Sequence, residues 1–180
     1  MKIQSFKNYI GKTHEVAMSG VLGIPINNYE KKGIDLIDSD KGVEVKGCLI
    51  YPESTDYKKN YVKWTLFDRE LHWHEKYCGL PLYCALGTYE LGVPREKLGF
   101  GDMNNLELFV ARREVWIVPW DWTLNFPIKE GKHHNYRYLR PRPVASSGIP
   151  AMPEIEFTKK IHGGLLHLTE GVKREHFKEL

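Results

Sequence analysis

Apolar residues recur at steps of three and four positions along the first part of the chain, from Ser5 to Leu22. This spacing predicts an amphipathic helix, because such residues share one helical face. Ser5 can cap the helix, and Gly23 followed by Pro25 can end it. The stripe consists of Phe6, Ile10, Thr13, Ala17 and Val21.

Glu15 lies beside this apolar stripe and not on the fully polar side of the predicted helix. We therefore expect its carboxyl group to face a half-buried cleft. The alternative is a solvated glutamate that pairs with Lys12 on the helix surface.

Two short apolar runs, 34–37 and 43–45, flank a polar turn that contains Asp, Ser and Gly. This pattern predicts a β-hairpin. Side chains alternate along a strand, so Glu44 and Lys46 share one face of the second strand. If the two strands pair, Asp35 lies at the same end and on the same face. Two carboxylates and one ammonium then occupy a small volume.

The rest of the pattern predicts an α/β layout in which helices and strands alternate. We expect Trp116, Trp120 and Trp122 to pack against the sheet. The predicted elements are a strand at 61–67, a helix at 68–77 with Asp68 as N-cap, a buried strand at 80–91, a loop at 94–105, a strand ending at 119 and a short helix at 172–178.

The composition fits one globular domain: 180 residues, of which 42% are hydrophobic and 27% are charged. A net charge of +3 permits a polyanionic partner without requiring one. The three cysteines are an odd number without framework spacing, so we expect reduced thiols and a cytoplasmic location. No apolar run approaches about 18 residues, so we expect neither a membrane span nor a secretory signal.

Asp35 and Glu44 suggest a metal site, because two adjacent carboxylates repel each other unless a cation lies between them. Oxygen ligands with room for water suit Mg²⁺, with Mn²⁺ as a substitute. Such a site supports hydrolysis of a phosphodiester. Lys46 would then orient or deprotonate the attacking water.

The pattern of Asp35 and Glu44-Val45-Lys46, between β-like runs and after a helix that carries Glu15, resembles the PD-(D/E)xK nuclease superfamily of restriction endonucleases and junction resolvases. The resemblance covers about residues 5–90. It implies that Asp35 and Glu44 are metal ligands and that Lys46 is the catalytic lysine. Glu15 matches the acidic residue that many members place on the first core helix, as a further catalytic and metal-binding group. One departure is Ile34, where many members have proline.

The resemblance implies an α/β fold with a restriction-endonuclease-like core, in which helices flank a central mixed β-sheet. We expect one domain over 1–180, with the core at about 5–90. Residues 91–180 would add strands, a basic and aromatic segment and a C-terminal helix.

The implied activity is that of a Mg²⁺-dependent DNA endonuclease of the restriction type. We expect a homodimer, because one site cuts one strand. Two alternatives stay open: a structure-specific nuclease such as a Holliday junction resolvase, and a non-catalytic nucleic-acid-binding protein.

Between Lys129 and Arg142 the chain has five Lys or Arg residues against one Glu, with tyrosines and histidines interleaved. This composition suits contact with phosphates and stacking on bases, although a solvated loop is the alternative. Together with other basic positions, the candidate nucleic-acid contacts are Lys31, Lys32, Lys63, Lys132, Arg137, Arg140 and Arg142.

Overall fold

The computed structural model describes residues 3–28, 33–50, 62–140, 142, 144 and 148–180, with the backbone alone for 3–7 and 95. The candidate contacts Lys31 and Lys32 lie outside the described residues. Among the described residues, no helix combines the length and the apolar character needed to cross a bilayer.

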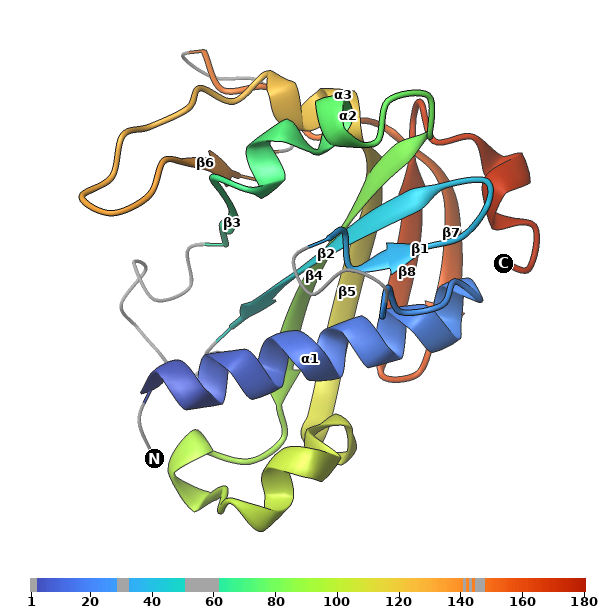
Figure 1. The fold of residues 1–180 in the computed structure, drawn as a ribbon. Coiled ribbons are helices and arrows are strands. Elements are labelled where there is room, and N and C mark those ends of the chain that lie inside the picture. Colours follow the sequence, from blue (N-terminus) through green and yellow to red (C-terminus); the bar gives the residue numbers. More distant parts are fainter. Residues whose placement is uncertain (1–2, 29–32, 51–61, 141, 143, 145–147) are drawn as a thin grey trace.

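A mixed six-stranded sheet forms the centre of the molecule, in the order β1-β2-β4-β5-β8-β7 (Figure 1). The predicted α/β class with a central mixed sheet is therefore confirmed. Strands β5, β7 and β8 come from the second half of the chain and complete the same sheet. The six strands are β1 (Leu36–Ile37), β2 (Gly42–Leu49), β4 (Leu82–Leu91), β5 (Val110–Pro119), β7 (Ile155–Ile161) and β8 (Gly164–Thr169).

The predicted hairpin is present, as β1 and β2 pair antiparallel with Leu36 opposite Val43. Asp38 closes the turn, because its Oδ1 accepts hydrogen bonds from the N–H groups of Asp40 and Lys41. β1 is only two residues long, whereas β2 continues and pairs in parallel with β4 on its other side. Beyond β1, one edge of β2 therefore has no partner strand among the described residues.

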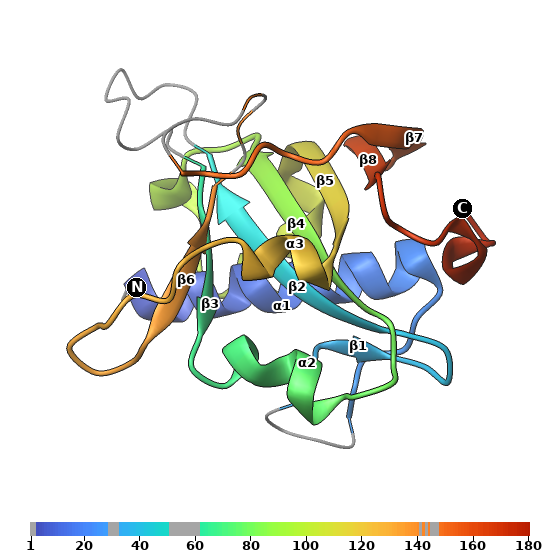
Figure 2. The same cartoon turned by 90° about the horizontal axis from the view of Figure 1, so that it is seen from above.

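The helix predicted from the apolar stripe is α1 (Ile3–Leu22), which packs against β2 on one face of the sheet. Met18 and Leu22 enter the core between α1 and the sheet, together with Val43 and Val45. The other face is covered by η1 (Glu70–His72), α2 (Trp73–Lys76) and α3 (Trp120–Leu124). Figures 1 and 2 show these elements on the side of the sheet opposite α1.

A second, two-stranded sheet lies over this other face and consists of β3 (Trp64–Phe67) and β6 (Tyr136–Leu139). Of the strand predicted at 61–67, residues 64–67 are present as β3 and residue 61 lies outside the described residues, but β3 does not belong to the central sheet. Trp64 anchors the small sheet, because its Nε1 donates a hydrogen bond to the carbonyl of Gly87 in β4, at 2.9 Å. The predicted packing of the Trp116, Trp120 and Trp122 cluster on this face is confirmed.

The prediction of one helix at 68–77 capped by Asp68 was wrong. The segment divides into η1 and α2, and neither has a side-chain cap. The Asp68 carboxylate instead accepts a hydrogen bond from the N–H of Asn135, 2.6 Å away. A long-range contact with the loop before β6 thus replaces the local cap.

Two predictions in the second half of the chain also need correction. The region at 94–105 is not a plain loop, because it contains η2 (Arg95–Lys97) and the start of η3 (Gly101–Phe109). The C-terminal helix is only the short η4 (Arg174–Phe177). The β7–β8 hairpin before it was not predicted. Its turn includes Gly163, whose φ of 74° favours glycine.

Candidate active site

Glu44 and Lys46 lie on one face of β2, as the strand alternation predicts. In the register with β4, Glu44 stands beside Cys84 and Lys46 beside Leu86. The Glu44 side chain is almost fully buried, at 1% exposure. A carboxylate removed from water in this way is costly unless it is paired and hydrogen-bonded.

Both oxygens of Glu44 have partners. Lys46 Nζ donates to Oε1 at 2.5 Å, and Trp73 Nε1 donates to Oε2 at 3.1 Å. Trp73 belongs to α2, so the layer above the sheet closes over the carboxyl group. Each carboxylate oxygen can still accept a further contact.

Glu70 is a further acidic residue of the site, and it was not predicted from the sequence. Its Oε1 accepts hydrogen bonds from Lys46 Nζ at 3.1 Å and from Arg69 Nε at 3.3 Å, while its Oε2 accepts one from the N–H of Phe67. In sequence, Glu70 looks like an ordinary glutamate in the first turn of a helix. Only the tertiary fold brings it to Lys46, and no local signal could have identified it.

Asp35 sits at the open edge of β2. Its Oδ2 accepts a hydrogen bond from the N–H of Val45 at 2.9 Å, which satisfies a strand amide beyond the end of β1. Among the described residues, its Oδ1 has no hydrogen-bond partner. The hairpin thus brings Asp35, Glu44 and Lys46 together, as the sequence predicts.

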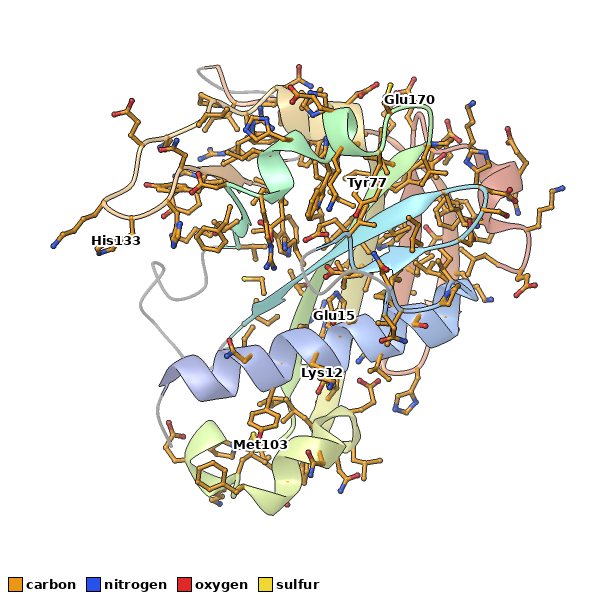
Figure 3. All side chains as sticks on the ribbon, in the orientation of Figure 1. Lys12, Glu15, Tyr77, Met103, His133 and Glu170 are labelled. Carbon is orange, nitrogen blue, oxygen red and sulfur yellow. The ribbon has the colours of Figure 1, made fainter. Side chains whose placement is uncertain are left out.

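Glu15 approaches the same edge from α1. Figure 3 shows it on the side of the helix that is turned toward the sheet. Burial raises the pKa of its carboxyl group, and the nearby Glu44 carboxyl raises it further. In the described part of the chain, no hydrogen bond or ion pair joins Glu15 to the other acidic residues.

Carboxyl groups outnumber cationic groups at this edge, and each pKa that is shifted among them is raised. Burial raises the pKa of Glu44 to about 8, and the Asp35 and Glu70 carboxyls add to the effect against the opposing charge of Lys46. The pKa of Asp35 is raised by burial and by Glu15 and Glu70, although Lys46 and the Val45 N–H oppose the shift. Four carboxyl groups therefore lie around one ammonium, whose side chain is 18% exposed.

The Lys46 ammonium remains charged in this setting. Burial alone would lower its pKa, but the carboxylates of Glu44, Glu70 and Asp35 outweigh burial and hold the pKa above its usual value. Lys46 therefore acts as a hydrogen-bond donor to Glu44 and Glu70 in this structure.

The donor set fits a hard divalent cation that keeps part of its water shell. Asp35 Oδ1 and the remaining lone pairs of Glu44 are the available oxygen ligands. Across the described ranges, no three His, Cys, Asp or Glu side chains lie close enough to hold an ion by themselves. A bound ion would therefore need water, or a phosphate oxygen, to complete its coordination.

The candidate nucleic-acid contacts are distributed unevenly. Lys63 and Arg140 lie around Tyr138 of the small sheet, and Lys132 is exposed in the loop before β6. Arg142 is tied to the following segment, because its carbonyl accepts a hydrogen bond from the N–H of Met152.

Arg137 does not occupy the exposed position that we expected. It alternates onto the inner face of β6, opposite Leu66, and is only 8% exposed. A basic residue in a strand faces inward or outward according to register, which composition cannot reveal. Its Nε and Nη1 have no hydrogen-bond partner within the described residues.

Comparison with known proteins adds no assignment. No family model matches the chain, and no curated protein matches it either.

Proposed function

We propose that this protein is a Mg²⁺-dependent DNA endonuclease with a restriction-endonuclease-like core that hydrolyses phosphodiester bonds. The observation that carries the proposal is the meeting of Asp35, Glu44 and Lys46 at the open edge of β2, with carboxylates in excess. The resemblance of these residues to the PD-(D/E)xK pattern supports it independently of the coordinates.

Asp35 and Glu44 would hold the Mg²⁺ ion, and Glu15 would assist directly or through a water molecule. When bound, the ion would acidify a water and neutralise the charge that grows on the phosphate oxygens. The clustered carboxyl groups favour a divalent cation, because the ion stabilises their ionised forms and replaces their mutual repulsion by attraction.

Lys46 would act through its retained proton. The ammonium can donate a hydrogen bond to the attacking water and stabilise negative charge on the phosphorane. Glu70 and Trp73 are positioning residues: Glu70 fixes the ammonium, and Trp73 fixes the carboxyl of Glu44. The sequence suggested two roles for Lys46: to orient the attacking water or to deprotonate it. Deprotonation is the less favoured role, because the raised pKa of Lys46 keeps its ammonium protonated.

One site of this kind cuts one strand, so cleavage of both strands calls for two sites. A homodimer on DNA is therefore part of the proposal, by analogy with the family that the motif resembles. Light scattering of the purified protein, with and without duplex DNA, tests it.

The central experiment measures nicking of supercoiled plasmid in Mg²⁺ or in EDTA. Wild-type protein should nick only with Mg²⁺, and the variants Lys46→Ala and Asp35→Asn should lose on the order of 10²–10³-fold in rate. Asp35→Asn keeps an oxygen that can accept the Val45 N–H, so it leaves the local fold intact. Lys178→Ala is the matched surface control, because Lys178 is an exposed lysine outside the candidate nucleic-acid contacts, and it should nick at the wild-type rate.

Circular dichroism should show that both variants fold, and each should still bind DNA. If the folded Lys46→Ala variant nicks plasmid at the wild-type rate, the proposed role of Lys46 in cleavage is wrong. DNA binding that falls with salt, together with a melting temperature that does not respond to Mn²⁺, would favour the non-catalytic alternative.

A further inference from the structure

The outer face of the small sheet carries three aromatic side chains. Trp64, Leu66 and Leu139 are buried beneath the sheet, so strand alternation turns their neighbours outward. Phe67 is opposite Tyr136, and its side chain is 48% exposed. The rings of Tyr136 and Tyr138 lie 4.5 Å apart. We call Phe67, Tyr136 and Tyr138 the aromatic platform.

Three cationic groups surround one ring of the platform. Measured to the centroid of the Tyr138 ring, Lys63 Nζ lies at 4.3 Å, Lys129 Nζ at 5.7 Å and Arg140 Cζ at 5.9 Å. All three lie within 6 Å of one point, so no two of them are more than about 12 Å apart. Lys63 and Lys129 form no ion pair with any described carboxylate.

Contact with the ring compensates only part of the mutual repulsion among these charges. An anion between them would remove more of it. The platform therefore combines ring faces, which attract other flat rings, with fixed positive charge, which attracts phosphate.

That combination matches an unpaired nucleic-acid strand. Its bases offer free π-faces and its backbone offers a phosphate at every step. A continuous duplex hides its base faces in the stack, so it can contact the cations through its phosphates but cannot stack on the rings.

We propose that the aromatic platform binds an unpaired DNA strand next to the site of cutting. The preferred substrates are then branched, forked or gapped DNA and not continuous duplex. This inference deepens the proposed nuclease function and rests on it.

The platform is connected directly to the candidate active site. Phe67 donates its backbone N–H to Glu70, and the other oxygen of Glu70 accepts a hydrogen bond from Lys46. A strand that stacks on the Phe67 ring would therefore contact a residue whose backbone amide is joined through Glu70 to the Lys46 ammonium.

The test measures binding without cleavage, by fluorescence anisotropy in EDTA. The probes are a forked duplex with an unpaired arm, a single strand, a blunt duplex of the same length and an RNA strand of the same sequence. Wild-type protein should bind the forked duplex at least tenfold more tightly than the blunt duplex. Tyr138→Leu and Phe67→Ser should each weaken binding of the unpaired strand at least fivefold, since stacking on one ring is lost.

Blunt-duplex affinity should change less than twofold in the same variants. Phe100→Leu is the matched control, because Phe100 is a 69% exposed aromatic outside the small sheet, and it should leave all affinities unchanged. Phe67→Ser alters an exposed side chain, so it provides a folded variant even if Tyr138→Leu unfolds.

Equal affinity of wild-type protein for forked and blunt duplex would overturn the proposal that the aromatic platform binds an unpaired strand. Unchanged binding of the unpaired strand by Phe67→Ser would overturn it as well. Tenfold tighter binding of the RNA strand than of the DNA strand would overturn the choice of DNA. The proposed nuclease function can fail separately. If wild-type protein prefers forked DNA in EDTA but never cuts DNA in Mg²⁺, the binding role of the aromatic platform stands and the nuclease proposal is wrong.

Discussion

His14 is a histidine that the fold keeps uncharged. Its ring is 2% exposed, and neither nitrogen has a hydrogen-bond partner among the described residues. A Cβ on Gly87 would lie 2.3 Å from its Nε2, so the ring packs directly on β4. Burial, with a smaller effect from the charge of Arg113, lowers its pKa to about 3.

The folded state therefore resists protonation of His14, whereas the unfolded chain takes up the proton near pH 6.5. Stability from this residue is complete above that pH and is lost as the pH falls from about 6.5 toward 3, by about 1.4 kcal/mol for each pH unit. His14→Leu should reduce the decline in free energy of unfolding over this range. Urea unfolding of both proteins at pH 7, 6 and 5 measures the difference.

Parallel pH curves for the two proteins would show that His14 does not titrate as its burial requires. Because acidic groups also titrate over this range, only the difference between the two proteins is informative.

The acidic residues of the site show what a local pattern can and cannot reveal. Asp35, Glu44 and Lys46 could be predicted to lie together, since a short hairpin and strand alternation determine their positions. Glu70 and Trp73 could not, because their approach depends on how the β2-to-β4 connection folds back over the sheet. Arg137 illustrates the same limit, since its place in a basic segment predicted a surface contact and the strand register buries it, at 8% exposure.

Among the elements, the success of prediction follows the sequence separation of the contacts. The long helix and the β1–β2 hairpin are local patterns and were predicted. β3 was predicted as a strand, but its partner β6 lies about seventy residues later, and alternation does not specify a partner. The β7–β8 hairpin is an exception: its contacts are local and residues 155–161 alternate between apolar and polar except at Lys159, yet it was not predicted.

The pairing of β5 with β8 requires a glycine at position 164. A Cβ there would lie 1.6 Å from the carbonyl oxygen of Arg113, which is backbone and cannot move aside cheaply. Gly164→Ala should lower the free energy of unfolding by at least about 3 kcal/mol. Gly101→Ala, where no atom lies within 4 Å of the added carbon, should change it by less than about 0.5 kcal/mol.

Chemical denaturation of the two alanine variants beside the wild-type protein provides the measurement. Equal stability of Gly164→Ala and Gly101→Ala would show that the β5–β8 contact is looser than described.

For the whole molecule, the proposed site predicts a response to divalent ions. A ligand that binds only the folded state stabilises it, by about 2.7 kcal/mol at a concentration one hundred times its dissociation constant. Mn²⁺ should therefore raise the melting temperature of the wild-type protein. Asp35→Asn should abolish the rise, because it removes one of the two proposed ligands. Thermal melts over a Mn²⁺ series test this, and an equal rise in both proteins would place the ion elsewhere.

The class of the whole fold could be predicted from the alternation of helices and strands, whereas its second sheet could not. That sheet depends on segments from both halves of the chain meeting over one face. The same meeting provides the small sheet with its outward rings and its inward tryptophan.

Glu70 serves two parts of the molecule with a single planar group. One oxygen takes the backbone amide of Phe67 and the other takes the Lys46 ammonium, so a rotation imposed on either side is transmitted to the other. Under the proposed function, substrate affinity and turnover would for that reason be linked quantities. Selection or engineering that tightens substrate binding at Phe67 would then also alter the surroundings of Lys46, and the two properties would not be optimised one at a time.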